Sequence, residues 1–109
     1  MKGKIHHFNS NHRKRIHIAA VLVNNFTNHM YAMAQDICKE HDVPFSILYS
    51  LISETSQKIK NLSPFDAQTG PAKRNDELTI KKHLNLLNQH QQEIYLKITQ
   101  SIQEYGNKL

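Results

Sequence analysis

The sequence has few of the residues that mark loop-rich or disulfide-bonded folds. Its 109 residues include three glycines, three prolines, one cysteine and no tryptophan. So few turn-forming residues disfavour a β-rich architecture. The single cysteine, Cys38, excludes an internal disulfide and fits a reducing compartment, so we expect a cytoplasmic protein.

Long apolar runs are also missing. The longest, residues 18–23, is far short of the roughly 20 residues that a membrane span needs. The first 15 residues are charged and lack the apolar centre of a signal peptide. The length and composition therefore predict one soluble domain over residues 1–109, without a membrane partner.

Several motifs that carry chemistry are absent. Eight histidines contain no His-x3-His or His-Glu-x-x-His pair, and Cys38 has no thiol partner, so we expect no metal site. The sequence has no Walker loop, no G-x-G-x-x-G fingerprint and no Ser/His/Asp spacing. These absences argue against a self-contained nucleotide-binding or hydrolytic domain.

The net charge of +5 is unevenly distributed. Five bases precede the first acid, Asp36: Lys2, Lys4, Arg13, Lys14 and Arg15. A basic arm can attract phosphate, but it is equally a solvated start of a helix. Because neither a reading helix nor an aromatic platform is recognisable, we expect no nucleic-acid partner.

The first third of the chain predicts one long helix from about Ser10 to Glu40, capped by Ser10 or Asn11. Its apolar residues recur in alternating steps of three and four: Ile16, Ala19, Val23, Phe26, Met30, Met33 and Ile37. This pattern is typical of a coiled-coil seam. Ile18 and Leu22 widen the apolar surface, so we expect a central helix covered by other helices or by a second subunit.

Proline and glycine divide the rest of the chain. Pro44 starts a second predicted helix that reaches Asn61, and a short helical turn is expected over 63–68. The apolar stripe of the second helix is Phe45, Leu48, Leu51, Ile52, Thr55 and Ile59.

Two further helices follow Gly70 and Pro71. One is capped by Asn75 or Asp76 and reaches Leu87, and the other runs over 91–105 and stops at Gly106. Their predicted buried residues are Ile80, Leu84, Leu87, Ile94, Ile98, Ile102 and Tyr105. Because no segment alternates with a period of two, the fold class is all-α, a helical bundle built on the long helix.

Polar side chains flank the apolar seam of the first helix. His17, Val21, Asn24, Asn28 and Tyr31 share one line at helical spacing, with Asn25 and His29 beside it. Three asparagines in five residues are poor helix formers, and buried amides need hydrogen-bond partners. They either fix the register between helices or form the polar wall of a ligand cleft, and spacing alone leaves both open.

The stretch AQTGPAKRNDELTIKKH, residues 67–83, concentrates polar and turn-forming residues. Thr69-Gly70-Pro71 predicts a sharp turn whose glycine lets another group approach the backbone. Asp76, Thr79 and His83 then share one face of the next helix. Arg74 and the helix N-terminus suit an anion such as phosphate or carboxylate. An N-cap, a solvated arginine and a core histidine explain the same residues equally well.

Two motifs carry a family resemblance. H-x-A-A-V-x-x-x-N-F-x-N-H at residues 17–29 and T-G-P-A-x-R-x-D-x-x-T-x-x-x-H at residues 69–83 occur in order. Together they resemble the helical C-terminal domain, labelled a domain of unknown function, of bacterial Rossmann-like oxidoreductases. That family is related to deazaflavin-dependent NADP reductases. The domain is similar to the C-terminal domains of 6-phosphogluconate dehydrogenase-type enzymes.

The resemblance implies a domain that forms the dimer and closes the substrate side of an NAD(P) cleft. It implies that His17 and Asn25 from the first motif line that cleft. It implies that six residues of the second motif line the same cleft, namely Thr69, Gly70, Pro71, Arg74, Asp76 and His83. The implied partners are a second copy, a Rossmann-type cofactor domain and a small, anionic substrate. No catalytic residue is assigned.

This sequence departs from the family by lacking a βαβ unit with a glycine fingerprint before the first helix. We therefore expect that the chain alone binds no NAD(P) and does not transfer hydride, and that the cofactor domain is missing or separate. The alternative function is a stand-alone helical dimerisation or interaction module.

Overall fold

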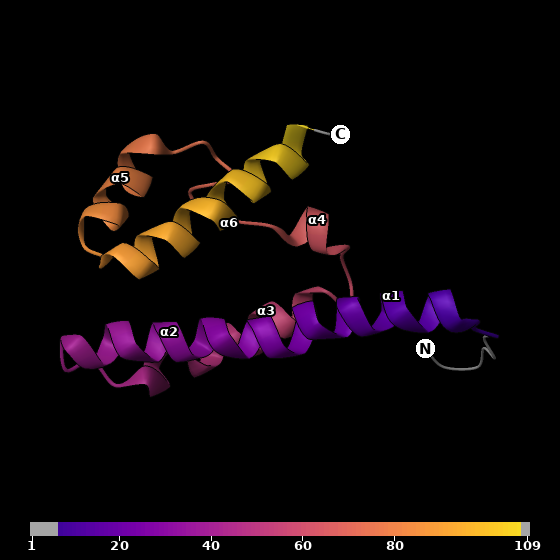
Figure 1. The fold of residues 1–109 in the computed structure, drawn as a ribbon. Helices are drawn as coiled ribbons and strands as arrows, with labels where there is room; N and C mark the ends of the chain where they lie inside the picture. Colours follow the sequence, from indigo (N-terminus) through magenta and orange to yellow (C-terminus); the bar gives the residue numbers. More distant parts are fainter. Residues whose placement is uncertain (1–6, 108–109) are drawn as a thin grey trace. The chain divides into compact units, whose positions relative to one another are not determined.

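The computed structural model describes residues 7–107, and every regular element in that range is a helix (Figure 1). This confirms the all-α class. The chain divides into two compact units, Met1–Ile47 and Leu48–Leu109. Lys2 and Lys4 of the basic arm lie outside the described residues. Within that range no helix combines the length and the apolar content that crossing a bilayer requires.

The first unit is built on a helix that confirms the expected bounds but is not α-helical throughout. It consists of α1 (Ser10–Ala20), a π-helical segment η1 (Val21–Phe26) and α2 (Thr27–Glu40). The predicted cap at Ser10 or Asn11 is wrong by one residue. Asn9 Oδ1 accepts from the His12 backbone N–H at 2.9 Å, and His12 Nδ1 accepts from the Asn9 N–H at 3.2 Å. This reciprocal pair satisfies two backbone donors, so the helix begins at Ser10.

The apolar seam of the long helix is largely open to solvent. Val23 is 74% exposed, Phe26 57% and Ile16 48%, whereas Met30 and Met33 are half-buried. The flanking side chains Ile18 and Leu22 are 61% and 54% exposed. The sequence predicted that other helices or a second subunit cover this surface, and among the described residues no side chain of the long helix is buried.

The second helix is shorter than predicted, and its first turn up to Ile47 belongs to the first unit. A 3-10 turn, η2 (Phe45–Leu48), leads into α3 (Tyr49–Lys58), because the first turn after Pro44 closes by an i to i+3 bond from Ile47 N–H to Pro44 carbonyl. Half of the predicted stripe is half-buried, namely Phe45, Leu48 and Ile52. The other half is exposed and was assigned wrongly, namely Leu51, Thr55 and Ile59.

The short turn at residues 63–68 is confirmed as α4 (Pro64–Ala67). Ser63 Oγ accepts from the Asp66 N–H at 3.2 Å, and Pro64 occupies the first turn, where its missing N–H costs nothing.

Helices α5 (Glu77–Asn85) and α6 (Gln89–Asn107) contact each other. The side-chain amide of Gln92 donates to the carbonyls of Leu84 and Leu87, at 2.7 and 3.0 Å. The Leu84 carbonyl also accepts from the Leu87 N–H at 3.2 Å, so Gln92 adds to the turn that closes the C-terminal end of α5. The buried residues of the described chain lie in this region: Ala72, Ile80, Gln91 and Thr99.

The buried face of α6 is shifted from the predicted stripe. Of the predicted stripe, Ile94 and Ile102 are half-buried, whereas Ile98 and Tyr105 are exposed; Gln91 and Thr99 are buried and Tyr95 is half-buried. The start of α6 explains the shift, because the side chains of Asn88 and Gln91 each accept from the other's backbone N–H. The predicted stop at Gly106 is also wrong. Gly106 has no positive φ and the helix continues to Asn107.

Candidate functional site

The turn before α5 has a backbone conformation that favours glycine at position 70. Gly70 has a φ of 102°, a region that residues with a Cβ rarely adopt. An added Cβ at Gly70 would meet no atom within 4 Å, so conformation, rather than a close approach by this chain, accounts for the glycine. Backbone bonds from Arg74 to Gly70 (3.3 Å) and from Asp76 to Pro71 (2.9 Å) close the turn and deliver Asp76 to the start of α5.

Asp76 is the N-cap of α5 and the centre of a small polar network. Its carboxylate accepts from the Thr79 hydroxyl at 2.8 Å and from the Thr79 backbone N–H at 3.2 Å. Arg74 Nη2 lies 3.4 Å from the same carboxylate. The Thr79 hydrogen bonds, with a smaller contribution from Arg74, lower the pKa of Asp76. The N-terminus of α5, predicted to receive an anion, therefore already holds the chain's own carboxylate.

Arg74 keeps most of its binding capacity despite this contact. Its side chain is 61% exposed, and its guanidinium carries five N–H donors. A single contact of 3.4 Å to an exposed carboxylate is a weak ion pair. Arg74 is thus anchored beside Asp76 with donors available to an external anion.

His83 is joined to a residue that the sequence did not single out. Its Nδ1 lies 2.7 Å from the hydroxyl of Tyr95 in α6, and the two rings meet edge to face at 5.7 Å. His83 is an exposed residue rather than a core histidine. It lies two turns beyond Asp76 on α5, roughly 10 Å along the helix axis.

The predicted cleft residues fall into the two units. Thr69, Gly70, Pro71, Arg74, Asp76 and His83 belong to the second unit, and His17 and Asn25 to the first. Contacts join Arg74 to Asp76, whereas His83 contacts Tyr95 instead. That the two motifs line one cleft stays a prediction.

Asn24 and Asn25 lie in the π-helical segment. Thr27 Oγ1 donates to the Leu22 carbonyl five residues earlier, at 3.1 Å. Short π-helical segments recur at functional positions in α-helices. Periodicity did not reveal this segment, although the poor helix-forming asparagines coincide with it.

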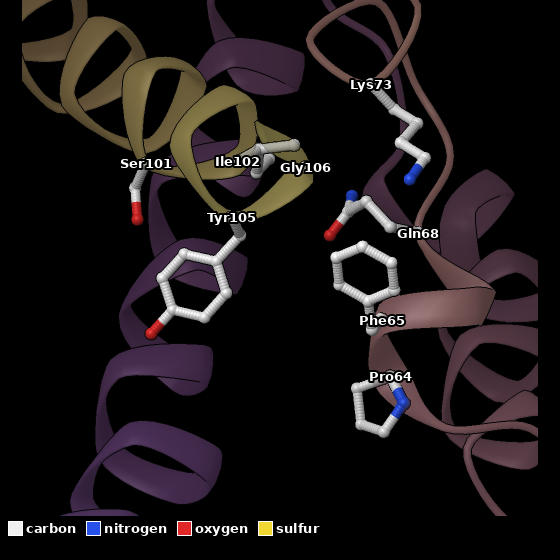
Figure 2. Close-up of a pocket in the computed structure, with 8 residues that line it drawn as sticks. All are labelled: Pro64, Phe65, Gln68, Lys73, Ser101, Ile102, Tyr105 and Gly106. Atoms are coloured by element: carbon white, nitrogen blue, oxygen red, sulfur yellow. The ribbon is translucent and has the colours of Figure 1, made fainter. Parts of the chain in front are cut away.

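A pocket of about 350 Å³ lies elsewhere in the second unit (Figure 2). Tyr105 lies on one side, and Phe65, Gln68 and Lys73 lie on the other. The Lys73 ammonium sits 4.6 Å from the centre of the Phe65 ring, a cation–π contact. A second, more open hollow borders the C-terminal end of α2 and Pro44. None of the eight predicted cleft residues lines either pocket.

Metal binding finds no support in the described part of the chain. No group of three or more His, Cys, Asp or Glu side chains there is arranged to hold a metal ion. Cys38 is half-buried and is a free thiol.

Comparison with known proteins identifies the fold and the family. A crystal structure described as "putative NADP oxidoreductase BF3122 from Bacteroides fragilis" superposes with a TM-score of 0.87 at 44% sequence identity. The match covers 89% of this chain but 38% of that one. None of the curated proteins compared with the chain matches it. The family profile described as "Domain of unknown function (DUF2520)" matches residues 1–102, and the chain therefore belongs to the DUF2520 family.

Proposed function

We propose that this chain is the C-terminal dimerisation and substrate-cleft domain of an NAD(P)-dependent oxidoreductase. One observation carries the proposal: 44% identity and a TM-score of 0.87, over nearly the whole chain, with a protein described as an NADP oxidoreductase. Because the chain spans 38% of that protein, the remainder is the natural source of the parts that this chain lacks.

Dinucleotide binding does not fit the residues of this chain. Pyrophosphate binding in Rossmann domains depends on closely spaced glycines between a strand and a helix. The three glycines here, Gly3, Gly70 and Gly106, are far apart in sequence, and residues 7–107 contain no strand. A separate Rossmann-type domain would therefore hold the NAD(P), and this chain alone would transfer no hydride.

Substrate binding is assigned to the exposed polar side chains around α5. Arg74 offers a cation with unused N–H donors, and His83 offers an imidazole whose second ring nitrogen can form a further hydrogen bond. Asp76 anchors Arg74 and orients its guanidinium. This set suits a small substrate with a carboxylate or phosphate group.

His17 and Asn25 are proposed as substrate contacts on the long helix. Both carry hydrogen-bonding groups that an α-helical surface does not need, and Asn25 lies in the π-helical segment. Their contribution is tested separately from that of α5, by substitution of one residue at a time.

Dimerisation is assigned to the exposed apolar surface of the long helix. Ile18, Leu22 and Val23 are each more than half exposed, which is unfavourable in water. Charge favours an antiparallel pairing of two copies. Arg13, Lys14 and Arg15 lie near the start of the helix, whereas Asp36, Lys39 and Glu40 give its end a net negative charge. Antiparallel pairing would place the basic end of one helix beside the acidic end of the other.

A chimera tests the proposal. The part of the Bacteroides fragilis protein that this chain does not match is joined to this chain, and NADPH oxidation is followed with a panel of small acceptors that carry a carboxylate or phosphate group. The acceptor is the one that the natural relative reduces fastest. We expect turnover by the chimera and a loss in Arg74→Ala and His83→Ala. Wild-type rates in both variants would remove these residues from the site.

The second candidate is a stand-alone helical interaction module. The same exposed apolar surface favours it, since self-association needs no cofactor domain. The two functions differ in the chimera, because an interaction module would form dimers but would not support NADPH oxidation.

A further inference from the structure

The contact between His83 and Tyr95 holds α5 and α6 together beside the proposed substrate site. His83 Nδ1 and the Tyr95 hydroxyl are 2.7 Å apart, and the rings meet at 89°. Gln92, one turn earlier on α6, binds the end of α5 through two carbonyls. The helices that carry the pair are thus also joined directly after His83, at Leu84 and Leu87.

The direction of this hydrogen bond follows from the phenol. Burial raises the pKa of Tyr95 above its ordinary value, so at neutral pH the hydroxyl keeps its proton and can donate it. When this hydroxyl donates to Nδ1, that nitrogen is the acceptor and carries no proton of its own.

We propose that Tyr95 is a positioning residue that holds His83 as the neutral tautomer with its proton on Nε2. His83 then presents an N–H donor from the opposite edge of the ring to an oxygen atom of the substrate. A neutral imidazole has one donor and one acceptor nitrogen, and the bond at one nitrogen decides the role of the other. The hydrogen bond from Nε2 to the substrate rests on the proposed function, whereas the tautomer of His83 does not.

Nitrogen NMR of the histidines in the intact chain tests the tautomer without a substrate. The signals of His83 are assigned by their loss in His83→Gln. We expect an unprotonated Nδ1 and a protonated Nε2 in the wild type, and averaging between both tautomers in Tyr95→Phe. That variant keeps the ring that packs on His83. Tyr31→Phe, which removes a hydroxyl in the first unit, should leave the His83 signals unchanged.

A protonated Nδ1 in the wild type would overturn the inference, and this measurement needs no variant. An unchanged tautomer in folded Tyr95→Phe would overturn it as well. In the chimera, Tyr95→Phe should lower kcat/KM roughly two- to tenfold, the range for one lost hydrogen bond, and His83→Gln should lower it further. If the tautomer shifts but both variants turn over at the wild-type rate, the pairing is right and the substrate role of His83 is overturned. These two failures are therefore distinguishable.

Discussion

Truncation of Leu22 tests the dimer surface on the long helix. Leu22→Ala removes about three CH₂-sized groups, each contributing about 0.8 kcal/mol when buried. Leu22 is 54% exposed, so a partner can bury about half of its side chain, and the truncation then costs about 1.3 kcal/mol of association free energy per subunit. A two-fold dimer contains the change twice, which raises the dissociation constant roughly 80-fold.

Sedimentation equilibrium over the micromolar range measures that constant. Leu78→Ala on α5 is the matched control, because it deletes the same groups from a side chain that is 66% exposed in the second unit. Both substitutions keep helix propensity nearly unchanged, so altered association cannot be attributed to helix loss. A wild-type chain that stays monomeric throughout, or equal effects of the two variants, would refute the assignment of this surface.

Three further predictions concern stability and the site. Gly70→Ala should destabilise the chain by about 1–3 kcal/mol, because Gly70 has a positive φ. Gly106→Ala should be neutral or stabilise the chain by at most about 1 kcal/mol, and thermal unfolding followed by circular dichroism compares the two variants. Asp76→Asn keeps an N-cap but loses the charge. The pKa of Asp76 is lowered below 3.8 in the folded state. The ionised carboxylate therefore stabilises the folded chain above about pH 3.8, and this stabilisation is lost as the pH falls through the lowered pKa. The difference in Tm between wild type and variant should thus be present at pH 7 and vanish in strong acid; a constant difference would contradict the network around Asp76. Asn25→Ala in the chimera should raise KM for the chosen acceptor, and an unchanged KM would remove Asn25 from the cleft.

Much of the helical layout was predictable because it depends on local chemistry. Ser63 followed by Pro64, and Asp76 followed by Thr79, are side-chain caps that act within one turn, and both cap the helices that the sequence indicated. The bounds of the long helix likewise follow from an uninterrupted apolar period and from the break before Pro44.

The remaining features depend on register and on contacts between helices. The π-helical segment changes one turn of an otherwise regular helix, which a period of three and four residues does not resolve. Tyr95 escaped notice because the predicted stripe of α6 ran through Ile94 and Ile98, one position away. Its partner, His83, is 12 residues distant and meets it only because α5 folds back on α6.

The chimera measures the central claim most directly, since it asks whether this chain completes an oxidoreductase. We expect the unmatched part of the Bacteroides fragilis protein to oxidise NADPH with the chosen acceptor only when this chain is attached, and we expect Arg74→Ala to lower the rate. An equal rate without this chain would contradict the account.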